Sequence, residues 1–176
     1  MKTTGVIRRI DDLGRIVIPK EIRKTMRIKD GESLEIFLDS DNIILKKYSL
    51  LDNLTDFYKK YVDSISSAID KNVIIVDRDK IVASAGVNKK KYLDKNISSY
   101  IDEIIQKRTL VAKKNMDNIS IINEDNEKLS YVVAPIIINS DAIGAVIIFS
   151  NDTIIDEFEK KTADIAAKFL GKYIEE

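Results

Sequence analysis

The sequence contains neither cysteine nor histidine among its 176 residues. Thiolate and imidazole are ligands in most structural zinc sites, so their absence argues against a metal centre of that kind. The same absence removes the usual general base near neutral pH and the Ser–His and Cys–His nucleophile pairs. Catalysis by carboxylates or lysines alone stays open, but no motif indicates it. We therefore expect a protein that is not an enzyme, with no catalytic residues, no metal and no cofactor.

Long apolar runs are also missing. No stretch approaches the roughly 18 residues that an apolar helix needs to cross a bilayer. The first twelve residues, MKTTGVIRRIDD, lack the apolar core of a secretion signal. Hydrophobic residues make up 44% of the sequence and charged residues 33%, which is typical of a soluble globular chain. We expect a cytoplasmic protein of one or two domains, without a membrane partner.

The charge of the sequence is balanced overall but unevenly distributed. The 29 lysines and arginines equal the 29 acidic residues, yet residues 1–29 carry nine cations against three acids, a net charge of +6. The rest of the chain therefore carries −6. A basic end on a neutral protein indicates an anionic partner, with an ordinary charged surface as the alternative that composition alone leaves open.

Local patterns group most of these cations around a turn and a short helix. The β-branched residues in 5–10 and 15–18 predict two strands, joined by the turn sequence DDLG at 11–14. Pro19 suits the first position of a helix that runs to about residue 27. Helical spacing gives this helix an inward apolar side and an outward basic side. The inward residues are Ile22 and Met26, and the outward ones are Lys20, Arg23, Lys24 and Arg27.

A second hairpin follows. The alternating residues 34–38 predict a half-buried strand, and a tight turn leads to a partner strand over 43–48. The first fifty residues are thus predicted to have the order ββαββ. A segment this short cannot bury enough apolar area to fold alone. We expect it to share its core with a second copy, which also provides the two-fold symmetry of a duplex DNA site.

These motifs carry a resemblance to a known family. Residues 3–48, TTGVIRRIDDLGRIVIPKEIRKTMRIKDGESLEIFLDSDNIILKKY, resemble the AbrB-type swapped-hairpin DNA-binding domain. The resemblance implies that two protomers interleave their hairpins into one β-barrel unit that binds double-stranded DNA. It also implies that basic residues of the loop and helix region meet the DNA, and these are Arg8, Arg9, Arg15, Arg23 and Lys24. Lysine lacks the planar fork of arginine, so Lys24 suits a phosphate better than a base edge.

Ion pairing within the chain is the alternative role for some of these cations. Arg9 has two acidic neighbours, Asp11 and Asp12, and an exposed pair with either would contribute little to stability. We interpret both aspartates as turn residues, because a carboxylate beside a phosphate repels it. Lys46 and Lys47 are interpreted as solvated residues that protect the edge of a sheet.

The rest of the chain alternates helical and strand patterns. Helices are predicted over 50–69, 97–108 and 153–174, with the last opened by Asp152 or Thr153, and residues 88–95 are interpreted as a basic loop. The predicted strands are 72–77, 80–86, 119–122, 131–138 and 142–149, and Pro135 suggests an edge or a bulge in its strand. This pattern predicts an antiparallel sheet flanked by helices, an α+β fold, and the segment resembles a GAF-like domain. We divide the chain into domains 1–50 and 51–176.

Two of the predicted helices carry more apolar residues than one sheet can cover. The first has a seam at Leu51, Leu54, Tyr58, Tyr61, Ile65 and Ala68 and a second stripe at Phe57, Val62 and Ile69. The last helix has a second stripe at Ile155, Phe158, Ile165 and Phe169. We expect a helix bundle between two copies to bury the excess. Together with the N-terminal dimer this predicts a homotetramer.

Along the whole chain the sequence resembles AbrB-family sporulation regulators. The resemblance implies a sequence-selective transcriptional regulator that activates some sporulation genes and represses others, with a C-terminal domain for assembly and ligand sensing. The sequence has no fingerprint for a particular ligand, so the ligand-binding residues stay unknown. The alternative is a MazE-like antitoxin, which shares the swapped-hairpin domain, binds a toxin and represses its own operon. Such antitoxins bind toxin through a disordered tail, whereas residues 51–176 have the periodic apolar pattern of a folded domain.

Overall fold

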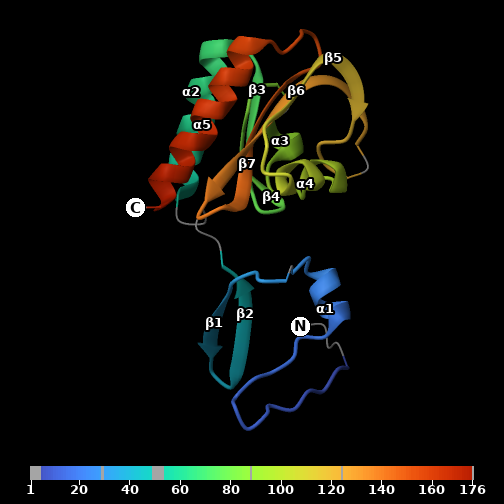
Figure 1. The fold of residues 1–176 in the computed structure, drawn as a ribbon, viewed down its shortest axis with the longest axis vertical. Helices are drawn as coiled ribbons and strands as arrows, with labels where there is room; N and C mark the ends of the chain where they lie inside the picture. The colour runs from blue at the N-terminus through green and yellow to red at the C-terminus, as the bar shows by residue number, and fades with distance from the viewer. Residues whose placement is uncertain (1–4, 29, 49–53, 88, 124, 176) are drawn as a thin grey trace. The chain divides into compact units, whose positions relative to one another are not determined.

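The computed structural model describes residues 5–28, 30–48, 54–87, 89–123 and 125–175. The chain forms two compact units, Met1–Tyr48 and Ser49–Glu176 (Figure 1). The expected α+β class is confirmed, because both units combine helices with antiparallel strands.

The N-terminal unit contains one helix and one hairpin. Helix α1 (Lys20–Thr25) begins directly after Pro19, and the hairpin pairs β1 (Leu34–Asp39) with β2 (Asn42–Lys47). The hairpin register runs from Leu34 opposite Lys47 to Asp39 opposite Asn42, so two residues form its turn. The second predicted hairpin is therefore present, within a residue of its predicted bounds.

The first predicted hairpin does not form among the described residues of the single chain. Among the described residues neither 5–10 nor 15–18 forms a strand. Backbone hydrogen bonds from Asp11 N to Arg15 O at 3.1 Å and from Gly14 N to Asp11 O at 3.0 Å close the turn between them. A strand needs a hydrogen-bonded neighbouring strand, and no described strand pairs with either of these two segments. The order ββαββ is thus α1–β1–β2 in one protomer.

Apolar side chains of this unit face solvent. The expected half-burial of β1 is not observed, since only Leu34 of its residues is partly buried, and α1 has no buried residue. Large exposed hydrophobic residues occur on both sides of the turn and on both strands of the hairpin: Val6, Ile7, Ile10, Leu13, Ile16, Val17, Ile36, Phe37, Leu38, Ile43 and Ile44. One copy of the unit has no apolar core of its own among the described residues.

The C-terminal unit is built on a five-stranded antiparallel sheet with the order β4-β3-β7-β6-β5 (Figure 1). Its strands are β3 (Asn72–Asp77), β4 (Lys80–Ala85), β5 (Val111–Ile119), β6 (Glu127–Ile138) and β7 (Asp141–Ser150). Helices α2 (Thr55–Ile69) and α5 (Glu157–Glu175) cover one face, and α3 (Lys89–Tyr92) and α4 (Ser99–Gln106) cover the other.

Strand β3 is buried along its whole length because both faces of the sheet are covered. Its alternate residues contribute to separate apolar layers, with Val73 and Ile75 on the α2–α5 side and Ile74 and Val76 on the α3–α4 side. This explains why its sequence, NVIIVD, is a continuous apolar run rather than an alternating one.

Helix ends are set by local hydrogen bonds. Asp156 and Glu159 form a reciprocal cap at the start of α5: the Asp156 carboxylate accepts from Phe158 N at 2.8 Å, and the Glu159 carboxylate accepts from Asp156 N at 3.0 Å. This cap starts α5 at residue 157, four to five residues later than the predicted opening at Asp152 or Thr153. At α4, Ser98 caps the helix by accepting from Ile101 N at 3.2 Å.

Three predictions for the C-terminal unit are wrong in detail. The strand expected at 119–122 lies instead at 111–119, where most side chains are exposed, so hydrophobic pattern could not identify it. Helix α3 forms within the predicted basic loop. For Pro135 only the edge alternative is wrong, because β6 lies inside the sheet, whereas a register shift at Ile136/Ile137, one residue beyond Pro135, agrees with the bulge alternative.

The apolar residues of α2 divide differently from the predicted stripes. Tyr58 and Val62, assigned to separate stripes, are both fully buried, whereas Ala68 of the predicted seam is exposed. Leu51 lies outside the described residues. On the C-terminal side, Ile155 precedes α5 and is buried, while Phe158 and Ile165 are 63% and 67% exposed. One broad apolar arc, centred on the residues that face the sheet, replaces the two stripes on α2.

Gly144 gives a direct test of sheet packing. A Cβ atom at this position would lie 2.0 Å from the carbonyl oxygen of Val76 on the neighbouring strand, a distance that no side chain tolerates. We expect Gly144→Ala to lower the free energy of unfolding by about 2–3 kcal/mol. Urea unfolding followed by circular dichroism measures this loss.

Gly171→Ala is the matched control. A Cβ atom at Gly171 would lie 2.9 Å from Ile137 O, a milder overlap, and alanine gains about 1 kcal/mol of helix propensity over glycine. A Gly144→Ala loss no larger than that of Gly171→Ala would contradict the steric explanation.

Candidate nucleic-acid interface

Asp11 organises the turn that the basic residues flank. Its carboxylate oxygen Oδ1 accepts hydrogen bonds from Leu13 N at 3.1 Å and Arg15 N at 2.7 Å, and its carbonyl accepts from Gly14 N at 3.0 Å. Gly14 has φ +76°, a conformation that glycine adopts without strain. The expectation that Asp11 and Gly14 serve the turn agrees with this geometry.

The same carboxylate holds the Arg15 side chain. Arg15 Nε donates to Asp11 Oδ2 at 2.8 Å, while 71% of the Arg15 side chain stays exposed. Guanidinium has five N–H donors, and in the described part of the chain the two terminal nitrogens have no protein partner. Asp11 therefore fixes the stem of Arg15 and leaves the end of its fork facing solvent.

Arg15 also lowers the pKa of Asp11 below its ordinary value. The largest cause is the hydrogen bond from the Arg15 backbone N–H, followed by the bond from the Arg15 side chain. Because the folded turn favours the ionised form, this interaction stabilises the turn at neutral pH, and the stabilisation is lost as the pH falls through the lowered pKa of Asp11.

Arg23 on α1 is engaged within its own unit. Its Nη1 donates to Asp30 Oδ1 at 2.5 Å, and its side chain is 38% exposed. Its Nε is buried without a hydrogen-bond partner in the described residues. Sequence reasoning missed Asp30, which lies seven residues further along and carries no motif.

The other three candidates are exposed cations. Arg8 and Arg9 precede the turn, and Lys24 lies on α1. No ion pair of these three residues forms within the described part of the chain. Arg9 does not pair with Asp11, since that carboxylate bonds Arg15 instead. Lys47, by contrast, lies 3.8 Å from Glu32 and is 21% exposed, so its interpretation as a solvated edge residue is wrong.

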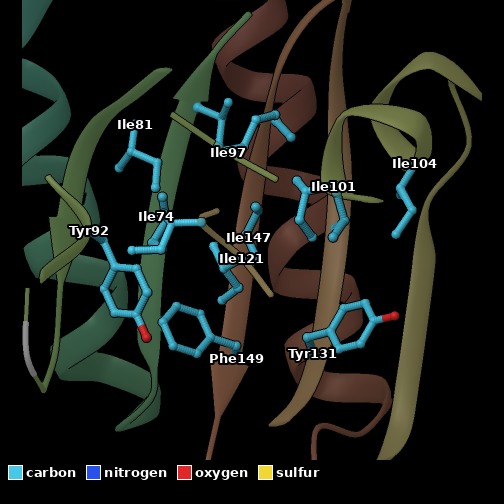
Figure 2. Packing of buried hydrophobic residues seen from close by; sticks show 14 of the residues in the cluster. Ile74, Ile81, Tyr92, Ile97, Ile101, Ile104, Ile121, Tyr131, Ile147 and Phe149 are labelled. Carbon is cyan, nitrogen blue, oxygen red and sulfur yellow. The ribbon is translucent and has the colours of Figure 1, made fainter. Parts of the chain in front are cut away.

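On the C-terminal unit, the space over the sheet beneath α3 and α4 is filled with side chains. Figure 2 shows Ile74 and Ile147 from the sheet packed against Ile97, Ile101 and Ile121 from the covering segments. In the part of the chain that the structure describes, no group of three or more acidic side chains is placed to hold a metal ion. The described helices include none that is long and apolar enough to cross a membrane.

The chain joins a unit with a basic turn and a hairpin to an antiparallel sheet that has helices on both faces. Sequence comparison identifies this chain as a two-domain transcription factor. Residues 53–175 match the family model of the stage V sporulation protein T C-terminal domain, described as a transcription factor. Residues 7–50 match the model of the MazE antitoxin domain. The chain belongs to the stage V sporulation protein T family.

Individual relatives support this assignment. The chain is 46% identical to stage V sporulation protein T of Bacillus subtilis over 178 residues that cover all of both chains. Over 48 residues it is 54% identical to the transition state regulatory protein AbrB of B. subtilis, covering 27% of this chain and 50% of AbrB. These findings confirm the AbrB-type resemblance and the expectation of a sporulation transcription factor.

Solved structures confirm the GAF-like fold. The cofactor-binding GAF domain of the nutrient sensor CodY from Clostridium difficile has a TM-score of 0.53 at 14% identity, covering 88% of this chain and 94% of that one. A GAF domain from an Acinetobacter phosphoenolpyruvate-protein phosphotransferase has a TM-score of 0.57 at 14% identity, covering 69% of this chain and 81% of that one. At these identities the likeness concerns the fold alone.

The Asp11–Arg15 interaction is testable by titration. We expect the pKa of Asp11, measured from side-chain carboxyl shifts by NMR, to lie below the ordinary aspartate value of about 3.9. Arg15→Gln removes the side-chain hydrogen bond and should raise the pKa of Asp11 partway, because the backbone N–H groups of Leu13 and Arg15 still donate. An Asp11 pKa that Arg15→Gln leaves unchanged would show that the guanidinium does not hold this carboxylate in solution.

Proposed function

We propose that the chain binds double-stranded DNA through residues 1–50 and regulates promoters of sporulation genes, activating some and repressing others. The carrying observation is the arrangement at the turn, where Asp11 fixes Arg15 and leaves its terminal nitrogens exposed on a segment with a net charge of +6. The excess positive charge of residues 1–29 attracts the phosphate backbone at long range. The proposed DNA contacts are Arg8, Arg9, Arg15, Arg23 and Lys24.

Arg23 would exchange partners on binding. Its acceptor, Asp30, is 94% exposed, and an exposed ion pair contributes only about 0–1 kcal/mol. A phosphate oxygen offers the same guanidinium a charge-assisted hydrogen bond together with the release of counterions. The ion pair with Asp30 therefore positions the Arg23 side chain, and breaking that pair would cost little free energy when DNA binds.

The N-terminal unit would act as an interleaved dimer. Segments 5–10 and 15–18 pair with no strand among the described residues, and the apolar residues on the turn and the hairpin face solvent. A second copy that inserts its own segments beside these supplies both the missing backbone hydrogen bonds and the missing apolar cover. The dimer then presents two copies of the basic surface with two-fold symmetry, which suits a duplex.

A second interface would lie on helices α2 and α5. Aromatic rings line up between the two helices, with centroids 4.8 Å apart for Phe57 and Tyr173 and 5.5 Å for Tyr61 and Phe169. Phe169 and Tyr173 nevertheless stay 44% and 42% exposed, and Ile165 is 67% exposed. The same helix pair of a second copy would cover this surface as a four-helix bundle. Combined with the N-terminal dimer, this interface produces a homotetramer.

This function needs no catalysis, and we propose that the chain is a cytoplasmic, DNA-associated protein rather than an enzyme. The antitoxin alternative has less support. The MazE model covers only residues 7–50, and the segment where an antitoxin carries a disordered toxin-binding tail is here the folded sheet domain. Copurification of a small toxin in stoichiometric amount would favour the antitoxin.

DNA binding at graded salt concentrations tests the proposed contacts. With about 6–10 phosphate contacts, affinity for promoter fragments should fall about 10³–10⁵-fold between 50 and 200 mM salt. Arg15→Ala/Arg23→Ala removes four cations from each DNA-binding dimer. We expect it to reduce the slope of log affinity against log salt by about 3–4, as measured by fluorescence anisotropy.

The control removes the same charge elsewhere. Lys89→Ala/Lys90→Ala takes two exposed cations from α3 of the C-terminal unit, and its salt slope should match the wild type. Equal slopes for all three proteins would mean that Arg15 and Arg23 are ordinary surface residues.

Molar mass by light scattering tests the second interface. Phe169→Glu places a charge on the exposed surface of α5, and we expect it to halve the mass of the assembly without unfolding the chain. Leu93→Glu introduces the same charge at a position that is also 44% exposed and that directly follows α3, on the other face of the sheet, and the assembly should keep its wild-type mass. A wild-type mass for Phe169→Glu would exclude α5 from the interface.

A further inference from the structure

A polar cavity of about 670 Å³ lies at the β5 edge of the sheet, beside the start of α4. It is within the size range of small-molecule sites, about 300–1,000 Å³. Hydroxyl, amide and charged side chains line it, among them Ser99, Tyr100, Lys113, Asp117, Asn118 and Asn126. The cavity therefore differs from the space over the centre of the sheet, which isoleucine side chains fill (Figure 2).

The apolar layer under α4 ends at Tyr131. Its ring is fully buried on β6, and its hydroxyl, directed away from the isoleucine cluster in Figure 2, lies 2.6 Å from the hydroxyl of Tyr100. The next strand, β5, places Lys113 opposite Tyr131 and Asp117 opposite Leu129. Side chains directly opposite each other in an antiparallel pair point to the same face. Both charges thus lie on the sheet face that α4 covers.

Lys113 and Asp117 are uncommitted charges of opposite sign. Neither forms an ion pair with any described residue, although only three residues separate them along β5. Asp117 lies close enough to the buried hydroxyl of Tyr131 to contribute to the raised pKa of that tyrosine, after burial and the Tyr100 hydrogen bond. A tyrosine is neutral near pH 7 even at its ordinary pKa of about 10, so the Tyr131 hydroxyl can donate or accept a hydrogen bond.

The strand sets the spacing of the two charges. A rise of about 3.3 Å per residue separates the Cα atoms of residues 113 and 117 by up to ~13 Å. The register shift between these positions shortens that distance, and the flexible lysine stem can reach toward the aspartate. Their partners on β6, Tyr131 and Leu129, are only two residues apart, so a ligand that spans the two charged positions has about the length of two extended residues, roughly 7 Å.

We propose that this cavity binds a small zwitterion whose ammonium and carboxylate groups are separated by about the length of a dipeptide. Lys113 would bind the carboxylate and Asp117 the ammonium. The asparagine and serine side chains and the tyrosine pair would hydrogen-bond the polar groups between the two ends. This site goes beyond the proposed DNA-binding function and does not depend on it.

Edge protection is the competing role for these charges. Sheet edges commonly carry inward-pointing charged residues that prevent pairing with another sheet, and β5 is an edge strand. A purely protective role requires no ligand, so direct binding measurements separate the two explanations.

Isothermal titration of the full-length protein with L-alanyl-L-alanine and with 6-aminohexanoate tests the proposal. We expect at least one of these to bind with a dissociation constant below about 1 mM, and L-alanine, whose charges are too close together, to bind at least 10-fold more weakly. Lys113→Gln and Asp117→Asn should each weaken binding at least 10-fold. Both positions are exposed, so thermal melting should show that the variants stay folded.

Lys114→Gln is the matched control. Lys114 follows Lys113 on the same strand, but its charge acts on Asp156 at the start of α5, on the opposite side of the sheet. Its substitution should leave binding unchanged. No binding of either probe up to about 10 mM, or binding that Lys113→Gln and Asp117→Asn do not weaken, would overturn the proposal and leave edge protection as the role of these residues.

Discussion

Both units of this protein depend on the burial of apolar surface, because each unit leaves large apolar side chains exposed in the single chain. Among the described residues of the N-terminal unit, segments 5–10 and 15–18 form no strand and contribute to no buried apolar core. In the C-terminal unit, α2 and α5 cover the sheet and still expose Phe158, Ile165 and Phe169. The proposed second copy would cover both surfaces, so the symmetry of the proposed assembly would follow from hydrophobic burial before any property of DNA is considered.

Electrostatics then favours an anionic partner for the basic segment, residues 1–29. The basic segment carries a carboxylate within its turn, and Asp11 uses that charge to fix the backbone and to hold Arg15 by its Nε. An acidic residue in a basic segment thus orients a cation instead of neutralising it, because the terminal nitrogens stay exposed. Residues 30–176, with a net charge of −6, balance the basic segment, so the molecule as a whole is neutral.

The sheet face under α3 and α4 has an apolar centre and a polar edge at β5. Isoleucine side chains fill the centre of the α3–α4 face, and polar and charged groups begin only where Tyr131 meets Tyr100 at the β5 edge. At 14% identity the similarity to GAF domains concerns the backbone fold and not the side chains. The chemistry of any site in this chain must therefore come from its own side chains.

Much of this protein is determined by sequence alone. Turn residues, the proline before α1, strand alternation and helical periodicity are local signals, so the second hairpin, β3, β4, β6, β7, α2 and α4 were predictable, as was the family. Local sequence pattern did not reveal β5, because its polar residues become a strand only by pairing with β6. It also did not reveal the start of α5, which the Asp156–Glu159 cap determines. The Arg23–Asp30 and Lys47–Glu32 pairs and the two charges beside Tyr131 likewise depend on distances that only folding creates. Local propensity acts between neighbours in sequence, whereas burial and ion pairing act between neighbours in space.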